Sequence, residues 1–176
     1  MQIDNIEIKL RIADPEAARA AVEALADGPA EVLEQTDTYF GTGEGAYLKL
    51  REENGRASLI AYRRELGQEP QPSDIRLTPL DNAAELGETL AHALGIRVVV
   101  AKTRQLYFSG QTRIHLDEVD RLGDFLELEV VLEPGQSEQD GLNIARQLLQ
   151  RLEVDDAEAQ TDSYRDLLLG YPANAD

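Results

Sequence analysis

The chain contains no cysteine, and only two of its 176 residues are histidine. Without cysteine there is no disulfide and no thiolate metal site. A metal ion would therefore have to be held by oxygen ligands or by the two histidines, and such a donor set favours hard cations such as Mg²⁺ or Mn²⁺.

Long apolar runs are also missing. No segment approaches the roughly 20 apolar residues that a membrane-spanning helix needs. The first residues, MQIDNIEIK, lack the basic start and the apolar stretch of a signal peptide. We therefore expect a cytoplasmic protein that does not bind membranes.

Positive charge is scarce, with 17 Lys and Arg against 34 Asp and Glu and a formal net charge of −17. This balance argues against general binding to nucleic acid or to anionic membranes, since both need a basic surface. The three lysines are Lys9, Lys49 and Lys102, and each lies in a segment with a strand pattern. Their placement suggests positions suited to an anionic ligand.

Length and an apolar content of 42% predict one domain with a sizeable core over residues 1–170. The last residues, 171–176, read YPANAD and are expected to be disordered.

Four segments have helical spacing of apolar residues, and two of them begin with clear start signals. Asp14 is a predicted N-cap followed by Pro15, and Ser137 stands three residues before Asp140 in a weaker form of the capping box. The predicted helices cover residues 14–28, 81–95, 137–152 and 163–169.

Seven segments read as strands, and most of them alternate apolar and charged residues. The dipeptide Asn54-Gly55 predicts a tight hairpin between two of them. The predicted strands cover residues 5–12, 47–52, 58–65, 74–80, 98–108, 112–119 and 124–132, and the segment 67–74 between the third and fourth reads as a loop.

The charged residues of several strands share one face. Such strands must place their apolar sides against the helices and their charged sides together. The sheet could curl into a barrel with a polar interior, or stay open with its charged face in water. Recurring basic pairs favour the first arrangement, because a highly charged anion such as a triphosphate would offset their repulsion.

Carboxylates occur on the same faces. Glu127 and Glu129 are two residues apart on one strand, so their side chains point the same way. Glu7 or Asp117 could complete an oxygen cluster for a divalent cation.

The sequence NIEIK at residues 5–9 resembles the ExExK signature of the CYTH superfamily, the triphosphate tunnel metalloenzymes. Further segments follow in the order typical of the class IV adenylyl cyclase-like branch and cover nearly the whole chain. They are DTYF, LKLRE, AYRR, KTRQLYF, RIHLDEVDRLGDFLELE and SYRDLL.

This resemblance implies an α+β fold: an eight-stranded antiparallel closed β-barrel, the triphosphate tunnel, with helices packed outside. It implies that Glu7 is a metal carboxylate with a catalytic role and that Lys9 is a phosphate contact or catalytic base. The implied substrate contacts are Lys49, Arg51, Arg63, Lys102, Arg104 and Arg113. The implied ligands of Mg²⁺ or Mn²⁺ are Glu7, Asp117, Glu127 and Glu129, whereas Arg11, Arg76 and His115 line the tunnel without an assigned role.

The implied function is a metal-dependent adenylyl cyclase that converts ATP to cyclic AMP and pyrophosphate, and a homodimer is compatible with this branch. One alternative is an inorganic or thiamine triphosphatase of the same superfamily. Another is a non-catalytic module that binds a nucleotide or polyphosphate. Asn5 supports the second alternative, because it stands where the motif has its first glutamate and removes one anionic metal ligand.

Overall fold

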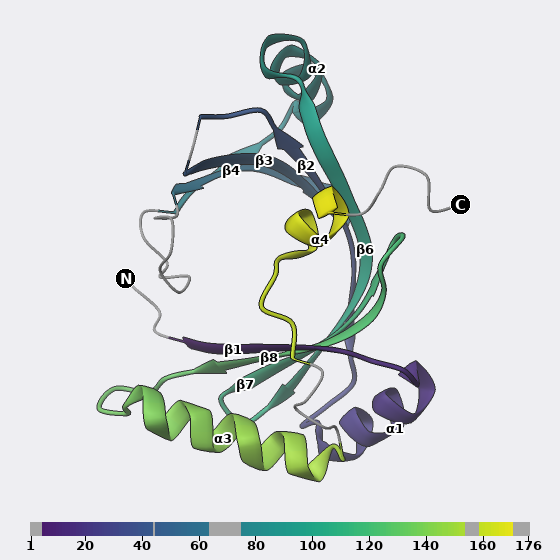
Figure 1. Ribbon diagram of the computed structural model, residues 1–176, viewed down its shortest axis with the longest axis vertical. Helices are drawn as coiled ribbons and strands as arrows, with labels where there is room; N and C mark the ends of the chain where they lie inside the picture. The colour runs from purple at the N-terminus through teal and green to yellow at the C-terminus, as the bar shows by residue number, and fades with distance from the viewer. Residues whose placement is uncertain (1–4, 44, 64–74, 154–158, 171–176) are drawn as a thin grey trace. The chain divides into compact units, whose positions relative to one another are not determined.

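The computed structural model describes residues 5–43, 45–63, 75–153 and 159–170 (Figure 1). It has an α+β fold, as predicted. The strands are β1 (Asn5–Arg11), β2 (Glu31–Phe40), β3 (Ala46–Glu53), β4 (Arg56–Arg63), β5 (Arg76–Leu80), β6 (Ile96–Ser109), β7 (Thr112–Val119) and β8 (Gly123–Val131). The helices are α1 (Pro15–Leu25), α2 (Ala83–Leu94), α3 (Glu138–Arg151) and α4 (Tyr164–Gly170).

The eight strands form one antiparallel sheet in the order β1-β8-β7-β6-β2-β3-β4-β5. Within the described ranges this order has two end strands, β1 and β5. Hydrogen bonds between the described strands therefore do not close the sheet, and closure into a barrel stays a prediction. The expected loop at 67–74 and the expected disordered tail at 171–176 lie outside the described residues.

The chain divides into two compact units. Unit 1 comprises residues 1–33 and 103–163, and unit 2 comprises residues 34–102 and 164–176. The chain passes from one unit to the other within β2 and within β6.

The core of unit 1 lies between its strands and two helices. Figure 1 shows α1 and α3 on one side of β1, β8 and β7. The buried residues of each helix are spaced so that they lie on one helical face. The apolar side chains of the strands pack against these faces. The buried cluster contains Leu10, Ala18, Val22, Tyr107, Ile114, Leu116, Leu126, Leu128, Leu148, Leu149 and Leu152.

Helix ends follow the predicted signals. Asp14 caps α1 by accepting a hydrogen bond from the backbone N–H of Ala17 at 3.0 Å. Ser137 and Asp140 form the full capping box at the start of α3. These caps satisfy backbone donors that the first helical turn leaves unpaired.

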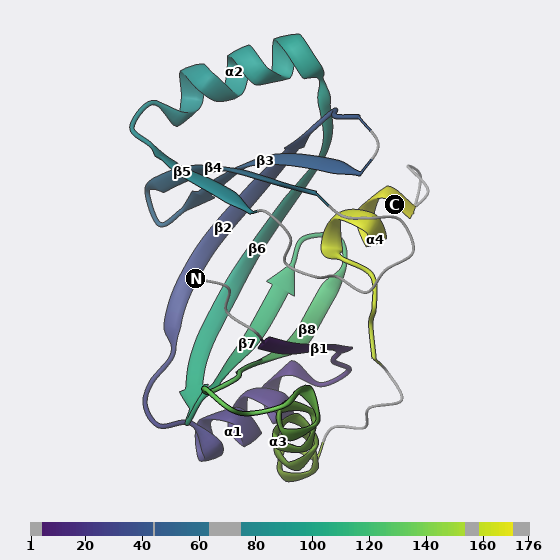
Figure 2. The same cartoon turned by 90° about the vertical axis from the view of Figure 1, so that its left-hand side faces the viewer.

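Unit 2 contains the predicted hairpin of β3 and β4. Its turn residues Asn54 and Gly55 have φ values of 46° and 77°, as a two-residue turn with left-handed backbone requires. Figure 2 shows α2 lying over these strands. Gly87 allows close packing there, because a Cβ at this position would lie 3.1 Å from Leu50 Cδ2.

Strand β2 was not among the seven strands predicted from the residues, and only the family resemblance implied an eighth. Two of its buried positions are polar, Gln35 and Asp37. The apolar alternation that marks the other strands is therefore absent here.

No helix in the described part of the chain is long and apolar enough to cross a membrane.

We predict that Gly41→Ala destabilises the protein by about 1–3 kcal/mol, the usual cost of overpacking. A Cβ at Gly41 would lie 2.5 Å from the backbone oxygen of Leu94, which cannot rotate away, and the N–H of Gly41 is tied to the Gly95 oxygen at 3.0 Å. Chemical denaturation measures the change. Gly43→Ala is the matched control, since nothing lies within 4 Å of its added Cβ. Equal stabilities for the two variants would contradict the packing described here.

Candidate functional site

Strand β8 is the centre of the charged face in unit 1. Its neighbours are β1 on one side and β7 on the other. The register places Glu127 opposite both Lys9 and His115, and Glu129 opposite both Glu7 and Arg113. Directly opposed residues of antiparallel strands share a face, so alternation in three separate segments brings these side chains together.

Glu127 is the most heavily contacted carboxylate of this face. Its Oε1 lies 3.0 Å from His115 Nδ1, and both carboxylate oxygens lie 3.5 Å from Arg104 Nη2. Lys9 Nζ lies 4.0 Å from its Oε2. Burial alone would raise the pKa of Glu127, but the His115 hydrogen bond and the Arg104 charge hold that pKa well below its usual range. Glu127 is therefore a fixed anion.

Arg104 is oriented by a second carboxylate. Its Nε and Nη2 each donate to one oxygen of Asp117 at 2.6 Å, which is the bidentate geometry of a strong charge-assisted pair. Asp117 is fully buried, so the pair holds the guanidinium in one orientation beside Glu127.

Asn5 contacts Glu129. Its side-chain amide donates to Glu129 Oε1 at 2.8 Å, and Arg113 Nη1 lies 3.1 Å from Glu129 Oε2. The residue that departs from the ExExK signature therefore supplies a hydrogen-bond donor to the second glutamate of the β8 pair. A glutamate at position 5 would bring a like charge to this place.

Glu7 is the carboxylate with the weakest partner. Its side chain is 54% exposed, and its Oε1 lies 3.9 Å from Lys9 Nζ. The pKa of Glu7 is raised, first by loss of hydration and next by the negative charge of Glu127, with Glu129 adding to the effect. A cation close to Glu7 would relieve this repulsion.

No three His, Asp or Glu side chains among the described residues are positioned to hold one metal ion together. In unit 1 the carboxylates are instead held mainly by protein cations and hydrogen-bond donors.

Unit 2 has its own charged cluster, centred on Asp37 of β2. Lys49 Nζ lies 2.7 Å from Asp37 Oδ2, and Arg51 donates to both oxygens at 2.7 Å. Burial would raise the pKa of Asp37, but the Arg51 hydrogen bond and the Lys49 charge lower it overall. The sequence reasoning did not identify Asp37, although it lies in the quoted segment DTYF.

Two lysines of unit 2 contact tyrosine rings. Lys49 Nζ lies 5.3 Å from the ring centre of Tyr39, and Lys102 Nζ lies 5.0 Å from that of Tyr164 on α4. Such contacts stabilise a cation without neutralising it. The buried Tyr39 therefore also contacts the site.

Arg165 of α4 joins the same cluster. Its guanidinium carbon lies 4.9 Å from the ring centre of Tyr47 and 5.8 Å from that of Tyr39. Tyr47 in turn stacks on Tyr62, with ring centres 4.9 Å apart and planes 4° from parallel. The late SYRDLL segment thus contributes two side chains to unit 2.

The predicted site residues fall into two groups by unit. Unit 1 brings together Glu7, Lys9, Arg104, Arg113, Asp117, Glu127 and Glu129. Unit 2 brings together Lys49 and Arg51 and holds Lys102 against α4. Arg63 and Arg76 are exposed on β4 and β5. His115, given no role from the sequence, is buried and contacts Glu127.

The CYTH domain family model matches residues 4–164 of the chain. A protein of Aeromonas hydrophila named adenylate cyclase CyaB is 31% identical over 175 residues, covering 93% of this chain and 87% of that protein.

Two solved structures illustrate the likeness in fold. The PH1012 protein of Pyrococcus horikoshii has a TM-score of 0.78 at 22% identity, covering 95% of this chain and 99% of that chain. The Hippeastrum protein HpAC1, described as having a dominant triphosphatase activity, has a TM-score of 0.60 at 16% identity, covering 94% and 95% of the two chains.

We predict that Asp37→Asn destabilises the protein by about 3 kcal/mol at neutral pH, because Lys49 and Arg51 lose their buried counter-charge. The folded-state pKa of Asp37 lies below the ordinary value of 3.8. The contribution of Asp37 to the free energy of unfolding is therefore complete above about pH 4. It is lost as the pH falls through the lower pKa of the folded state. Denaturation measured from neutral to acidic pH should show that the variant loses less stability on acidification than the unchanged protein.

The control for this prediction is Asp120→Asn, which makes the same chemical change at an exposed turn residue. If both variants followed the same pH dependence, the Asp37 ion pairs would not stabilise the fold as described.

Proposed function

Because the chain belongs to the CYTH domain family, we propose that it is a divalent-metal-dependent enzyme acting on a triphosphate, and that it converts ATP to cyclic AMP and pyrophosphate. The relative that is 31% identical over most of both chains is named an adenylate cyclase, which supports this reaction.

The single observation that carries the proposal is the cation cluster of unit 2. In a chain of net charge −17, the side chains of Lys49, Arg51, Lys102 and Arg165 contact Asp37, Asp166 and three tyrosine rings. These four cations outnumber the two carboxylates, so the cluster keeps positive charge for an anionic ligand. We assign phosphate contacts to Lys49, Arg51, Arg63, Lys102, Arg104 and Arg113. Closure of the eight-stranded sheet is part of the same proposal.

The carboxylates of unit 1 suit a divalent cation in their chemistry. They offer only hard oxygen ligands, and the repulsion among Glu7, Glu127 and Glu129 would be relieved by a cation. Mg²⁺ is usually bound by one or two carboxylates together with substrate phosphates, not by a complete protein cage. The lack of a ready three-residue ligand group among the described side chains agrees with this mode. Glu7 and Glu127 would hold the metal, with Asp117 and Glu129 as further candidates.

In the proposed cyclase reaction the ribose 3′-oxygen attacks the α-phosphorus of ATP. The new O3′–P bond forms as the bond to the pyrophosphate oxygen breaks, and the hydroxyl proton is released. Lys9 lies within 4.0 Å of both Glu7 and Glu127, so its ammonium group is held at the centre of the carboxylate face. It is placed to stabilise negative charge that builds up on phosphate oxygens. A bound divalent metal would add Lewis-acid stabilisation of that charge.

An inorganic or thiamine triphosphatase is the second candidate. The carboxylate pair Glu127 and Glu129 favours it, as does the activity described for the Hippeastrum protein. A non-catalytic binding module is the third candidate, supported by Asn5 in place of the first motif glutamate.

Product analysis distinguishes these reactions. Purified protein is incubated with ATP, inorganic triphosphate or thiamine triphosphate in Mg²⁺ or Mn²⁺. Cyclic AMP with equimolar pyrophosphate is the expected result. Orthophosphate without cyclic nucleotide would establish the triphosphatase, and tight triphosphate binding without any product would establish the binding module.

We predict that Glu127→Gln lowers turnover by on the order of 100-fold or more, since even the outer partners of a metal site typically contribute 10–100-fold. The glutamine keeps the size of the side chain and can still accept from His115. The measurement is steady-state turnover on the best substrate, with the fold checked by circular dichroism. Glu118→Gln, an exposed glutamate on the same hairpin, is the control. Unchanged turnover in a folded Glu127 variant would rule out our metal assignment.

We also predict that Mn²⁺ binds weakly to the protein alone and much more tightly in the presence of a non-hydrolysable ATP analogue. The reason is that the described carboxylates do not form a complete site without phosphate oxygens. Electron paramagnetic resonance of free Mn²⁺ gives both affinities without any need for activity, once Mn²⁺ bound by the analogue in a protein-free sample is subtracted. Glu7→Gln should weaken the metal complex with the analogue. Equal Mn²⁺ affinity with and without the analogue would contradict this mode of binding.

A further inference from the structure

Arg11 of β1 has contacts unlike those of six other cations of the sheet and α4. A carboxylate lies within ion-pair distance of Lys9, Lys49, Arg51, Arg104, Arg113 and Arg165. Arg11 instead contacts a backbone carbonyl and an aromatic ring, and no described carboxylate forms an ion pair with it. In a chain with twice as many acidic as basic residues, Arg11 thus has no counter-ion among the described side chains.

The guanidinium of Arg11 is nevertheless fixed in place. Its Nη1 donates to the backbone oxygen of Leu122 at 2.5 Å, and its carbon lies 4.8 Å from the ring centre of the buried Phe125. The tight turn at Gly123, with φ of 89°, brings this carbonyl to the end of β1. A guanidinium has five N–H donors, so most of them remain available to a ligand.

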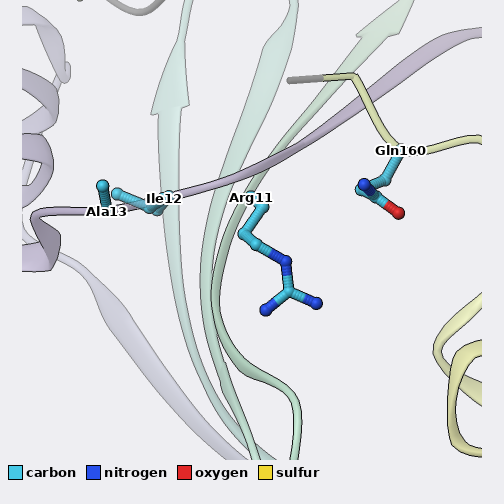
Figure 3. A pocket seen from close by; sticks show the side chains of 4 residues that line it. All are labelled: Arg11, Ile12, Ala13 and Gln160. Atoms are coloured by element: carbon cyan, nitrogen blue, oxygen red, sulfur yellow. The ribbon is translucent and has the colours of Figure 1, made fainter. Parts of the chain in front are cut away.

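Those donors lie beside a pocket of about 330 Å³ lined by Arg11, Ile12, Ala13 and Gln160. Figure 3 shows the side chains of Arg11 and Gln160 on the same side of β1. The backbone N–H of Gln160 donates to the Lys9 oxygen at 2.7 Å, and Ala159 forms a β-bridge with Leu10. Both polar groups therefore extend from backbone that is anchored to the same strand. The volume is at the low end of the range for small-molecule sites.

We propose that this pocket, the Arg11 pocket, binds the carboxylate of a small organic acid. The carboxylate accepts parallel hydrogen bonds from the guanidinium, which is the geometry that arginine provides for this group. The Gln160 amide offers a further donor, and Ile12 and Ala13 supply the apolar part of the pocket lining. One formal positive charge and a neutral amide match a monoanion. A polyphosphate would require several cations, as in unit 2.

Chemical-shift titration of the full-length protein tests the proposal, with propionate and inorganic phosphate as probes. We expect propionate to shift the Arg11 Nε–H resonance and the backbone amides of Ile12 and Ala13 saturably. Phosphate should have a much weaker effect. No saturable shift, or tighter binding of phosphate than of propionate, would overturn the carboxylate site.

Substitutions test whether propionate binds in the Arg11 pocket. Arg11→Gln should weaken propionate binding by about tenfold or more, read at Ile12 and Ala13, because a charged hydrogen-bond partner is lost. Gln160→Met should weaken it several-fold, and this variant tests the site even if Arg11→Gln fails to fold. Arg146→Gln removes an exposed arginine from α3 of the same unit and should leave binding unchanged. Equal weakening by Arg146→Gln would show a general charge effect and would overturn the assignment.

A competition experiment separates this pocket from the proposed triphosphate site. Propionate shifts should persist when a non-hydrolysable ATP analogue saturates the protein in Mg²⁺. Displacement of propionate by the analogue would instead make Arg11 part of triphosphate binding and would overturn an independent carboxylate site. The result does not depend on which triphosphate reaction the protein catalyses.

Discussion

A charge held on a sheet face and largely removed from water needs a partner of opposite charge or a strong hydrogen bond, because desolvation otherwise costs several kcal/mol. This constraint organises both units. In unit 1 it joins Glu127 to His115, Arg104 and Lys9, and in unit 2 it joins Asp37 to Lys49 and Arg51. The ion pairs fix the orientation of the side chains that any anionic ligand or metal would meet.

The same constraint explains the different character of the two clusters. The unit 1 carboxylates alternate with cations across three strands, so the face is close to electrical balance and Glu7 remains its most weakly paired acid. In unit 2, Lys49, Arg51, Lys102 and Arg165 outnumber their partners Asp37 and Asp166, and tyrosine rings contact three of these cations. One cluster thus suits a cation between carboxylates, and the other suits phosphate oxygens.

Much of this arrangement could be predicted from the sequence, because period-2 alternation assigns each residue of a strand to a face. By this rule Lys49 shares a face with Arg51 and Arg113 with His115, and their contacts with Asp37 and with the β8 glutamates agree. The strand that the alternation did not predict was β2, because its buried positions Gln35 and Asp37 are polar and break the pattern. The sequence also could not predict which side chains pair across strands, because the register of β1 against β8, and not the spacing along either strand, brings Asn5 to Glu129. The family resemblance supplied the eighth strand that the pattern did not.

The pairing of β1 with β8 has a consequence for biosynthesis. Asn5 and Glu129 are 124 residues apart in the chain, and unit 2 is largely encoded between the two segments of unit 1. During synthesis β1 must therefore wait for β8, the last strand of the sheet in chain order, before its hydrogen bonds form. Contacts of such sequence separation are slow to form. Until then the apolar side of β1, which includes Ile6, Ile8 and Leu10, lacks its sheet partner and is prone to aggregation.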